Sequence, residues 1–298
     1  MSFDAKTWLL FALGAIALFH LATLGAAIAR KRREASGEGI VPSPVGIGIG
    51  AVTNFFDTLG IGSFAPTTAL FRFTKSVPDE RIPGTLNVGH TIPTFVEAFI
   101  FIQAVQVDPT TLISMIAASV LGAWLGAGVV SSWPRQRIQR GMAICLIVAA
   151  LLFLAKVLEI APAAGVATGV TGVKLAIAVV GNFILGALMT LGIGLYGPCL
   201  ILVSLLGMTP TAAFPIMMGS CAFLMPVASA KFATTGRFDL KAALGLIIGG
   251  APAVLVAALI VKSLPLNYVM WLVIIVVLYT AVTMLRSASK PAPAPAAA

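Results

Sequence analysis

Two long stretches of this chain, residues 109–134 and 175–230, contain no charged residue. A helix of about 20 apolar residues is long enough to cross the hydrocarbon core of a bilayer. Of the 298 residues, 59% are hydrophobic and 10% are charged, whereas soluble domains carry about 25% charged residues. The mean hydropathy is +1.05. The chain is therefore predicted to be an all-α integral membrane protein.

The formal net charge of +9 could indicate a nucleic-acid surface. The basic residues, however, lie between the apolar segments, as the cluster Arg30 to Arg33 after the first segment illustrates. This placement is typical of charges that flank membrane helices. The lipid bilayer is the expected partner, and no nucleic-acid partner is expected.

A ten-residue pattern occurs twice in the chain. Residues 58–67 read TLGIGSFAPT and residues 190–199 read TLGIGLYGPC, at an offset of 132. The segments 129–134 (VVSSWP) and 260–265 (IVKSLP) repeat at an offset of 131. The repeat predicts two similar halves, residues 44–160 and 174–286. They follow an N-terminal anchor and basic loop at 1–43 and precede a Pro/Ala tail at 287–298, which is expected to be disordered.

The distribution of Lys and Arg decides between two topologies. Full spans are predicted at about 8–29, 84–105, 110–133, 139–158, 211–233, 241–261 and 266–285. The repeated motifs lie in the apolar segments 44–74 and 174–207, which either cross the membrane or turn back as re-entrant hairpins. Two hairpins place most of the 19 Lys and Arg residues on one side, which the positive-inside rule favours. The N-terminus is then outside and the C-terminus cytoplasmic, in a multi-pass protein of the cytoplasmic (inner) membrane.

Each half then consists of one re-entrant hairpin and three transmembrane helices, after the extra N-terminal span. Because three is odd, the second half enters from the opposite face, and the repeat is inverted. The two hairpin tips are expected near the bilayer midplane. Gly- or Pro-interrupted segments at corresponding positions of two halves are typical of the binding site of a transporter.

The hairpin tips carry the first set of candidate substrate-binding residues. Glycines let the backbone turn and approach a ligand, and prolines suit the first turn of the helix that follows. Two helix N-termini would present unpaired N–H groups to an anion. The alternative is that the glycines only allow close helix packing. The candidates are Thr58, Gly60, Gly62, Ser63, Pro66, Thr190, Gly192, Gly194 and Pro198.

A polar stripe follows the first hairpin, with residues spaced three and four apart on one helical face: Asn87, His90, Thr91, Thr94 and Glu97. Polar side chains in a membrane face the protein interior or water. Asn87, His90 and Thr91 are candidate substrate contacts. Asp57, His90 and Glu97 are candidates for proton coupling. The alternative is a structural role in interhelical hydrogen bonds.

The two L-G-I-G-x-x-x-P motifs, one opening each half, resemble the sulfite exporter TauE/SafE family over about residues 44–285. The usual member has three glycines after the isoleucine, whereas Ser63-Phe64 and Leu195-Tyr196 follow Gly62 and Gly194 here. The resemblance implies a transporter for small sulfur-containing anions, such as sulfite or short organosulfonates.

These observations favour a secondary transporter for a small anion. A passive anion channel is the alternative within transport, and a membrane scaffold or enzyme is the alternative outside it. No HExxH, GxSxG or Walker-type motif is present, so no catalytic residue is proposed and no enzyme is expected. The three cysteines, Cys145, Cys199 and Cys221, have no metal-ligand spacing, and no metal or cofactor is expected. The chain could form a homodimer.

Overall fold

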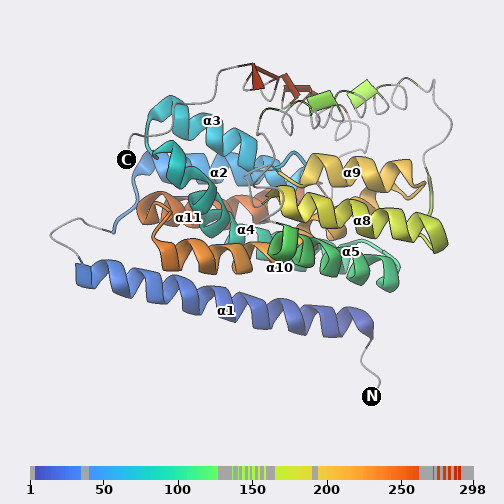
Figure 1. Cartoon of the computed structure of the whole chain (residues 1–298), viewed down its shortest axis with the longest axis horizontal. Helices are drawn as coiled ribbons and strands as arrows, with labels where there is room; N and C mark the ends of the chain where they lie inside the picture. The colour runs from blue at the N-terminus through green and yellow to red at the C-terminus, as the bar shows by residue number, and fades with distance from the viewer. Residues whose placement is uncertain are drawn as a thin grey trace.

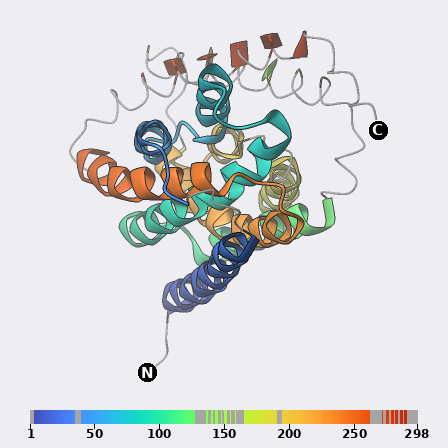
Figure 2. The same ribbon diagram turned by 90° about the vertical axis from the view of Figure 1, so that its left-hand side faces the viewer.

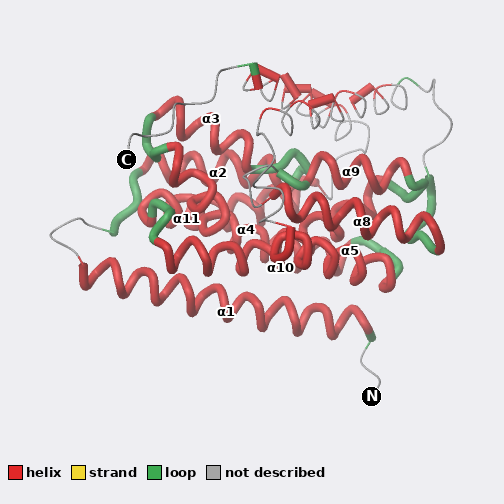
Figure 3. The backbone as a smooth tube through the Cα atoms, in the orientation of Figure 1, coloured by secondary structure: helices red, strands yellow, loops and turns green. Residues whose placement is uncertain are grey.

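The computed structural model describes residues 4–34, 40–126, 165–189 and 194–261, together with single positions between 136 and 158 and between 271 and 289. Every element in the part of the chain so described is a helix (Figure 1; Figure 3). The prediction of an all-α protein is confirmed for these residues.

The described helices begin at positions that the sequence marks. Ser43 and Asp108 cap two of them, each followed by a proline in the first turn. The elements are α1 (Ala5–Glu34), α2 (Pro44–Thr58), α3 (Phe64–Thr74), η1 (Asp79–Arg81), α4 (Ile82–Ala104), α5 (Pro109–Leu121) with a π-helical turn (Gly122–Gly126), α8 (Gly172–Met189), α9 (Tyr196–Leu205), η3 (Pro210–Ala212), α10 (Ala213–Thr235) and α11 (Leu240–Val261).

Five helices among the described residues are long and apolar enough to cross a membrane: Ala5–Arg33, Ile82–Ala104, Gly172–Met189, Pro210–Thr235 and Leu240–Ile260. Four of them coincide with the predicted spans 8–29, 84–105, 211–233 and 241–261. The fifth, α8, is the first arm of the second predicted hairpin and has 18 residues. The predicted spans 139–158 and 266–285 lie outside the continuously described residues.

The helices run side by side, with α4 and α10 at the centre and α1 at the periphery (Figure 1; Figure 2). In an 18-residue apolar window of each helix, 78% of the residues are buried in α4 and in α10, against 22% in α1. The inner helices therefore hold the polar side chains that lipid would not tolerate, and α1 presents an apolar surface outward.

Glycines bring α2 and α8, the first helices of the pairs α2–α3 and α8–α9, close to another helix. A methyl group on Gly50 of α2 would lie 2.6 Å from the Leu246 Cα of α11. On the other side of the molecule, a methyl group on Gly186 of α8 would overlap the Ser119 carbonyl of α5. Small residues at such crossings allow the backbones to approach, which drives helix association in membranes.

The chain reverses between α2 and α3 over Leu59–Ser63. Gly60 and Gly62 have φ angles of +89° and +86°, a conformation that side chains with a Cβ rarely adopt. The equivalent turn between α8 and α9 includes residues 190–193, which lie outside the described residues. Figure 1 shows α2 and α3 towards the end where α1 finishes, and α8 and α9 towards the opposite end.

Candidate substrate site between the two helical turns

Two neighbouring helices present a buried polar surface to each other. On α2, Asn54, Asp57 and Thr58 are 0–2% exposed, and the spacing of three and four puts them on one helical face. Across from them, His90 and Glu97 of α4 are fully buried. The predicted stripe on α4 therefore faces the protein interior.

His90 joins three helices through its two ring nitrogens. Its Nδ1 lies 2.9 Å from Asn54 Oδ1 of α2, and its Nε2 lies 3.0 Å from Thr67 Oγ1 of α3. The Asn54 amide nitrogen donates to the Gly50 carbonyl at 2.8 Å, which fixes Oδ1 as the atom that faces the ring. An amide oxygen only accepts, so Nδ1 carries a hydrogen. A neutral His90 then accepts the Thr67 hydroxyl hydrogen at Nε2.

Glu97 connects the first half of the chain to the second. The Thr58 hydroxyl of α2 lies 2.9 Å from Glu97 Oε1, and the Tyr196 hydroxyl, in the first turn of α9, donates to Oε2 at 2.7 Å. Tyr196 is 4% exposed. One carboxyl group thus holds α2, α4 and α9 together at a single point.

The hydrogen atoms around Glu97 can be counted. The Thr58 hydroxyl has one hydrogen but lies 2.9 Å from both the Asn54 carbonyl and Glu97 Oε1. Both contacts become full hydrogen bonds when Glu97 donates to Thr58 and Thr58 donates to the Asn54 carbonyl. Every contact in this network is therefore a hydrogen bond when Glu97 carries a proton.

Asp57 lies beside the turn between α2 and α3. Its carboxyl group lines the same cavity as Ser63, the N-cap of α3, and interacts electrostatically with Ser63 and with Glu97. The N-terminus of a helix attracts negative charge. Asp57 thus occupies the end of α3 to which an anion would otherwise be drawn.

Gly62, in the turn between α2 and α3, and Gly194, just before α9, each lie next to the first residue of the other pair's second helix. A methyl group on Gly62 would lie 3.6 Å from the Tyr196 Cβ, and one on Gly194 would lie 3.9 Å from the Phe64 Cβ. Gly194 and Tyr196 are the equivalents of Gly62 and Phe64 at the offset of 132. Phe64 and Tyr196 are also the first residues of α3 and α9, so two helix N-termini lie next to each other.

A small cavity lies at this meeting point. Its volume is about 10 Å³, roughly the room that one water molecule needs. The lining combines polar groups with apolar and sulfur-containing side chains: Asp57, Gly62, Ser63, Phe64, Thr94, Met189, Gly194, Leu195, Tyr196, Cys221 and Met225. Between the Gly62 turn and the described start of α9, this space is too small for an oxyanion.

Three other predicted hairpin residues lie within the described part of the chain: Gly60, Pro66 and Pro198. A methyl group on Gly60 would lie 3.3 Å from the Phe214 ring. Pro66 and Pro198 each occupy the third position of their helix. Thr190 and Gly192 lie outside the described residues.

The remaining stripe residues hydrogen-bond mainly within α4. Asn87 donates to the Pro83 carbonyl, and its side-chain oxygen has no partner among the described residues. Thr91 bonds the Asn87 carbonyl and lies 3.4 Å from Ser229 Oγ of α10. Thr94 bonds the His90 carbonyl at 2.8 Å and lines the cavity. Among the stripe residues, His90 and Glu97 make the best-formed hydrogen bonds to other helices.

Two residues of the network were not among the predicted site residues. Asn54 precedes Asp57 and Thr58 by three and four positions, so extending the stripe analysis to residues 44–58 would have found it. Tyr196 was noted only as a departure from the family motif. Its link to Glu97 spans 99 positions and leaves no local pattern.

Nothing among the described residues gathers three or more His, Cys, Asp or Glu side chains in a form that could hold a metal ion. Cys199 and Cys221 are buried free thiols. The chemistry of the site therefore comes from hydroxyl groups, backbone N–H groups, one imidazole and two carboxyl groups.

Comparison with known proteins identifies the family. The profile of the sulfite exporter TauE/SafE family matches residues 2–153. The chain belongs to this family. The match includes α1, which the motif-based resemblance over residues 44–285 left out, and it ends before the second copy of the motif. No curated protein and no solved structure matches the chain. Members of this family are membrane transporters, which argues against the enzyme alternative at the level of the family.

The hydrogen bond between Tyr196 and Glu97 leads to a testable prediction. Tyr196→Phe removes the only hydroxyl group that reaches Glu97 Oε2 among the described residues, and a buried oxygen without a partner costs about 1–3 kcal/mol. We expect a lower unfolding midpoint in detergent. Tyr279→Phe is the control, since that side chain is 54% exposed. Equal midpoints for the two variants would show that the bond contributes no stability.

Proposed function

We propose that this protein is a secondary transporter that moves a small anion, sulfite or a short organosulfonate, across the cytoplasmic membrane. The substrate binds near the midplane, between the tips of two re-entrant hairpins formed by α2–α3 and α8–α9. The reciprocal contact of Gly62 with Tyr196 and of Gly194 with Phe64 carries this proposal. It brings two helix N-termini to one point in the middle of an apolar bundle.

The inverted repeat has support from contacts that recur between the halves. Asn54 of α2 meets Gly250 of α11, and Gly186 of α8 meets Ser119 of α5. Asn54 and Gly186 are equivalent at the offset of 132, and Ser119 and Gly250 at 131. Each hairpin thus packs against a helix that belongs to the other half of the chain. Such exchange is expected when a pseudo-two-fold axis relates the halves.

The chemistry of the tips suits an oxyanion without a fixed cationic partner. The first turns of α3 and α9 contain backbone N–H groups that their own helices do not use. Together with the Ser63 hydroxyl, these groups can donate hydrogen bonds to sulfonate or sulfite oxygens, and both helix dipoles favour negative charge there. The choice of a sulfur oxyanion rests on family membership.

A transport cycle follows from the closed tips and from Asp57. Because the cavity has room for about one water molecule, the turns must separate before an anion enters. An ionised Asp57 competes with the substrate for the N-terminus of α3, whereas a protonated Asp57 does not. Glu97 contacts Thr58, on the helix that carries Asp57, and it contacts Tyr196, on the second hairpin. Protonation of these carboxyl groups would therefore couple anion binding to a proton gradient, with His90 holding α2, α3 and α4 in register.

Orientation of the protein is the first point to test. Arg30 donates to the Thr234 carbonyl at 3.4 Å, which places the end of α1 beside the end of α10, near the basic loop at Arg237. We propose that this end is cytoplasmic, by the positive-inside rule. In a cysteine-free background, Ser76→Cys should react only with a membrane-permeant reagent, and Val166→Cys, near the start of α8 at the other end, should react with an impermeant one. Labelling of Ser76→Cys from outside intact cells would reverse the orientation.

Substitution of the turn glycines tests the binding site. Gly62→Leu and Gly194→Leu should abolish anion transport in proteoliposomes, because each side chain would enter the space between the tips. Gly25→Leu on α1 is the control, since a methyl group there meets no atom within 4 Å. Membrane insertion and unfolding midpoint show whether a variant has folded. Folded variants that still bind sulfite with unchanged affinity would place the site elsewhere.

Substitution of Glu97 separates a coupled transporter from a passive channel. Glu97→Gln can still donate to Thr58 and accept from Tyr196, but it cannot exchange a proton. In proteoliposomes, a pH gradient should drive uphill anion flux through the wild type and not through Glu97→Gln. A channel would instead conduct according to membrane potential and anion gradient, with the same response in both proteins. That result would exclude proton coupling through Glu97 and would not contradict the proposed binding site.

A further inference from the structure

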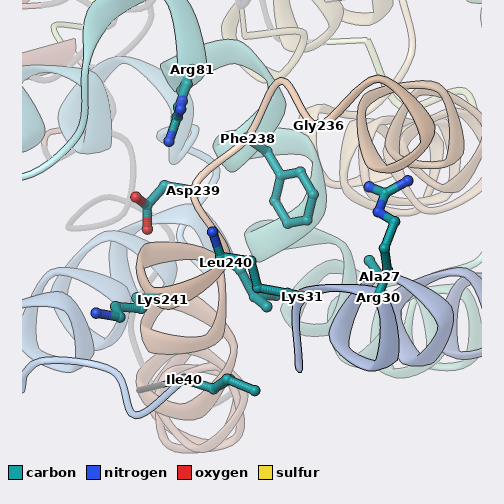
Figure 4. A pocket seen from close by; sticks show the side chains of 10 residues that line it. All are labelled: Ala27, Arg30, Lys31, Ile40, Arg81, Gly236, Phe238, Asp239, Leu240 and Lys241. Carbon is teal, nitrogen blue, oxygen red and sulfur yellow. The ribbon is translucent and has the colours of Figure 1, made fainter. Parts of the chain in front are cut away.

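A second polar pocket lies far from the hairpin tips, at the end of the molecule where α1 finishes. It has a volume of about 160 Å³. Its described lining comes from α1, the segment before α2, the N-terminus of α4, the loop after α10 and the start of α11: Ala27, Arg30, Lys31, Ile40, Arg81, Gly236, Phe238, Asp239, Leu240 and Lys241. Figure 4 shows basic side chains from these separate elements around Phe238 and Asp239.

Positive charge dominates the described lining of this pocket, which has four basic side chains and one carboxylate. The carboxylate of Asp239 already caps α11 by accepting the Ala242 N–H at 2.8 Å. Arg30 donates to the last carbonyl groups of α10. The charged groups of Arg81 and Lys241 have neither a hydrogen bond nor an ion pair with any other residue that the structure describes. Two cations are thus available to a ligand.

The start of α11 adds to this positive character. This helix has 22 residues, begins at Leu240, and directs its N-terminus at the pocket. Asp239 satisfies the N–H groups of Ala242 and Ala243, while those of Leu240 and Lys241 have no partner among the described residues. A phosphate group fits such a place, since it accepts hydrogen bonds from Arg, Lys and helix N–H groups together.

The pocket also has an apolar side. Ala27, Phe238 and Leu240 belong to a small hydrophobic cluster that fastens the end of α1 to α4, α10 and α11. Most of the outer surface of α1 is exposed, with Leu18 and Leu21 more than half accessible. The pocket therefore opens where apolar helices end and basic residues begin, at the depth of lipid head groups.

From this geometry we propose that the pocket binds the phosphate-bearing head group of an anionic phospholipid, with its acyl chains along α1. The phosphate lies between Arg81, Lys241 and the N-terminus of α11, and Lys31 and Arg30 close the side towards α1. Clusters of basic residues at the cytoplasmic ends of membrane helices attract anionic lipids. The lipid would hold the peripheral helix α1 against the bundle. The glycine crossings connect α2 with α11 and α8 with α5, and they do not include α1.

The test uses the purified full-length protein in detergent, titrated with phosphatidylglycerol, phosphatidylcholine or inorganic phosphate, with bound lipid measured by native mass spectrometry. Phosphatidylglycerol should bind and phosphatidylcholine should not. The double variant Arg81→Gln/Lys241→Gln should bind phosphatidylglycerol about 25-fold more weakly, since one basic residue near a membrane surface contributes about a fivefold factor. Lys75→Gln/Lys231→Gln is the control, with the same loss of charge at exposed positions outside the pocket.

Two outcomes would overturn the proposal. Equal weakening in both double variants would mean a diffuse surface charge and no site. Competition by inorganic phosphate at concentrations similar to the lipid would assign the pocket to a soluble anion. Neither measurement depends on transport, so the result stands apart from the proposed function.

Discussion

The structure depends on how closely α2 approaches α11 and α8 approaches α5. In a bilayer the surrounding lipid is as apolar as the side chains, so helices associate through close packing and hydrogen bonds. At these crossings the glycines at positions 50, 186, 249 and 250 have no room for a Cβ. Because each crossing fixes α2 or α8 on the other half of the chain, it also fixes where that helix ends, and the described residues Gly62 and Gly194 come to lie next to the first residues of α9 and α3.

The surroundings of Asp57 and Glu97 explain why carboxyl groups can lie inside the bundle of membrane helices. Asp57 and Glu97 have no Lys or Arg close by in the described structure; hydroxyl groups and the N-terminus of α3 surround them instead. A carboxyl group in this setting is stable when it is protonated, or when a helix end compensates its charge. The same donors are the ones that an oxyanion would use. In the proposed transport cycle, an internal carboxylate and an external anion therefore compete for these donors.

The distribution of charge gives the two ends and the centre different properties. The centre offers backbone dipoles and hydroxyl groups and, among the described residues, no fixed cation. The end near Arg81 and Lys241 offers fixed cations beside an apolar helix surface, which suits a ligand that stays in place. The proposed transported anion and the proposed lipid head group would thus meet different chemistry, although both are negatively charged.

The sequence alone determined the membrane class, the helical fold, four of the described spans and the family, because composition and a duplicated motif are local properties. It also placed Asn87, His90, Thr91, Thr94 and Glu97 on one buried face, since helical periodicity requires no knowledge of neighbours. Only the tertiary structure decided what that face meets. The pairing of His90 with Asn54 and of Glu97 with Tyr196 depends on which helices cross, and the crossings depend on backbone approach at single glycines. The pocket at the end of α1 likewise gathers residues from positions 27 to 241, and no sequence period connects them.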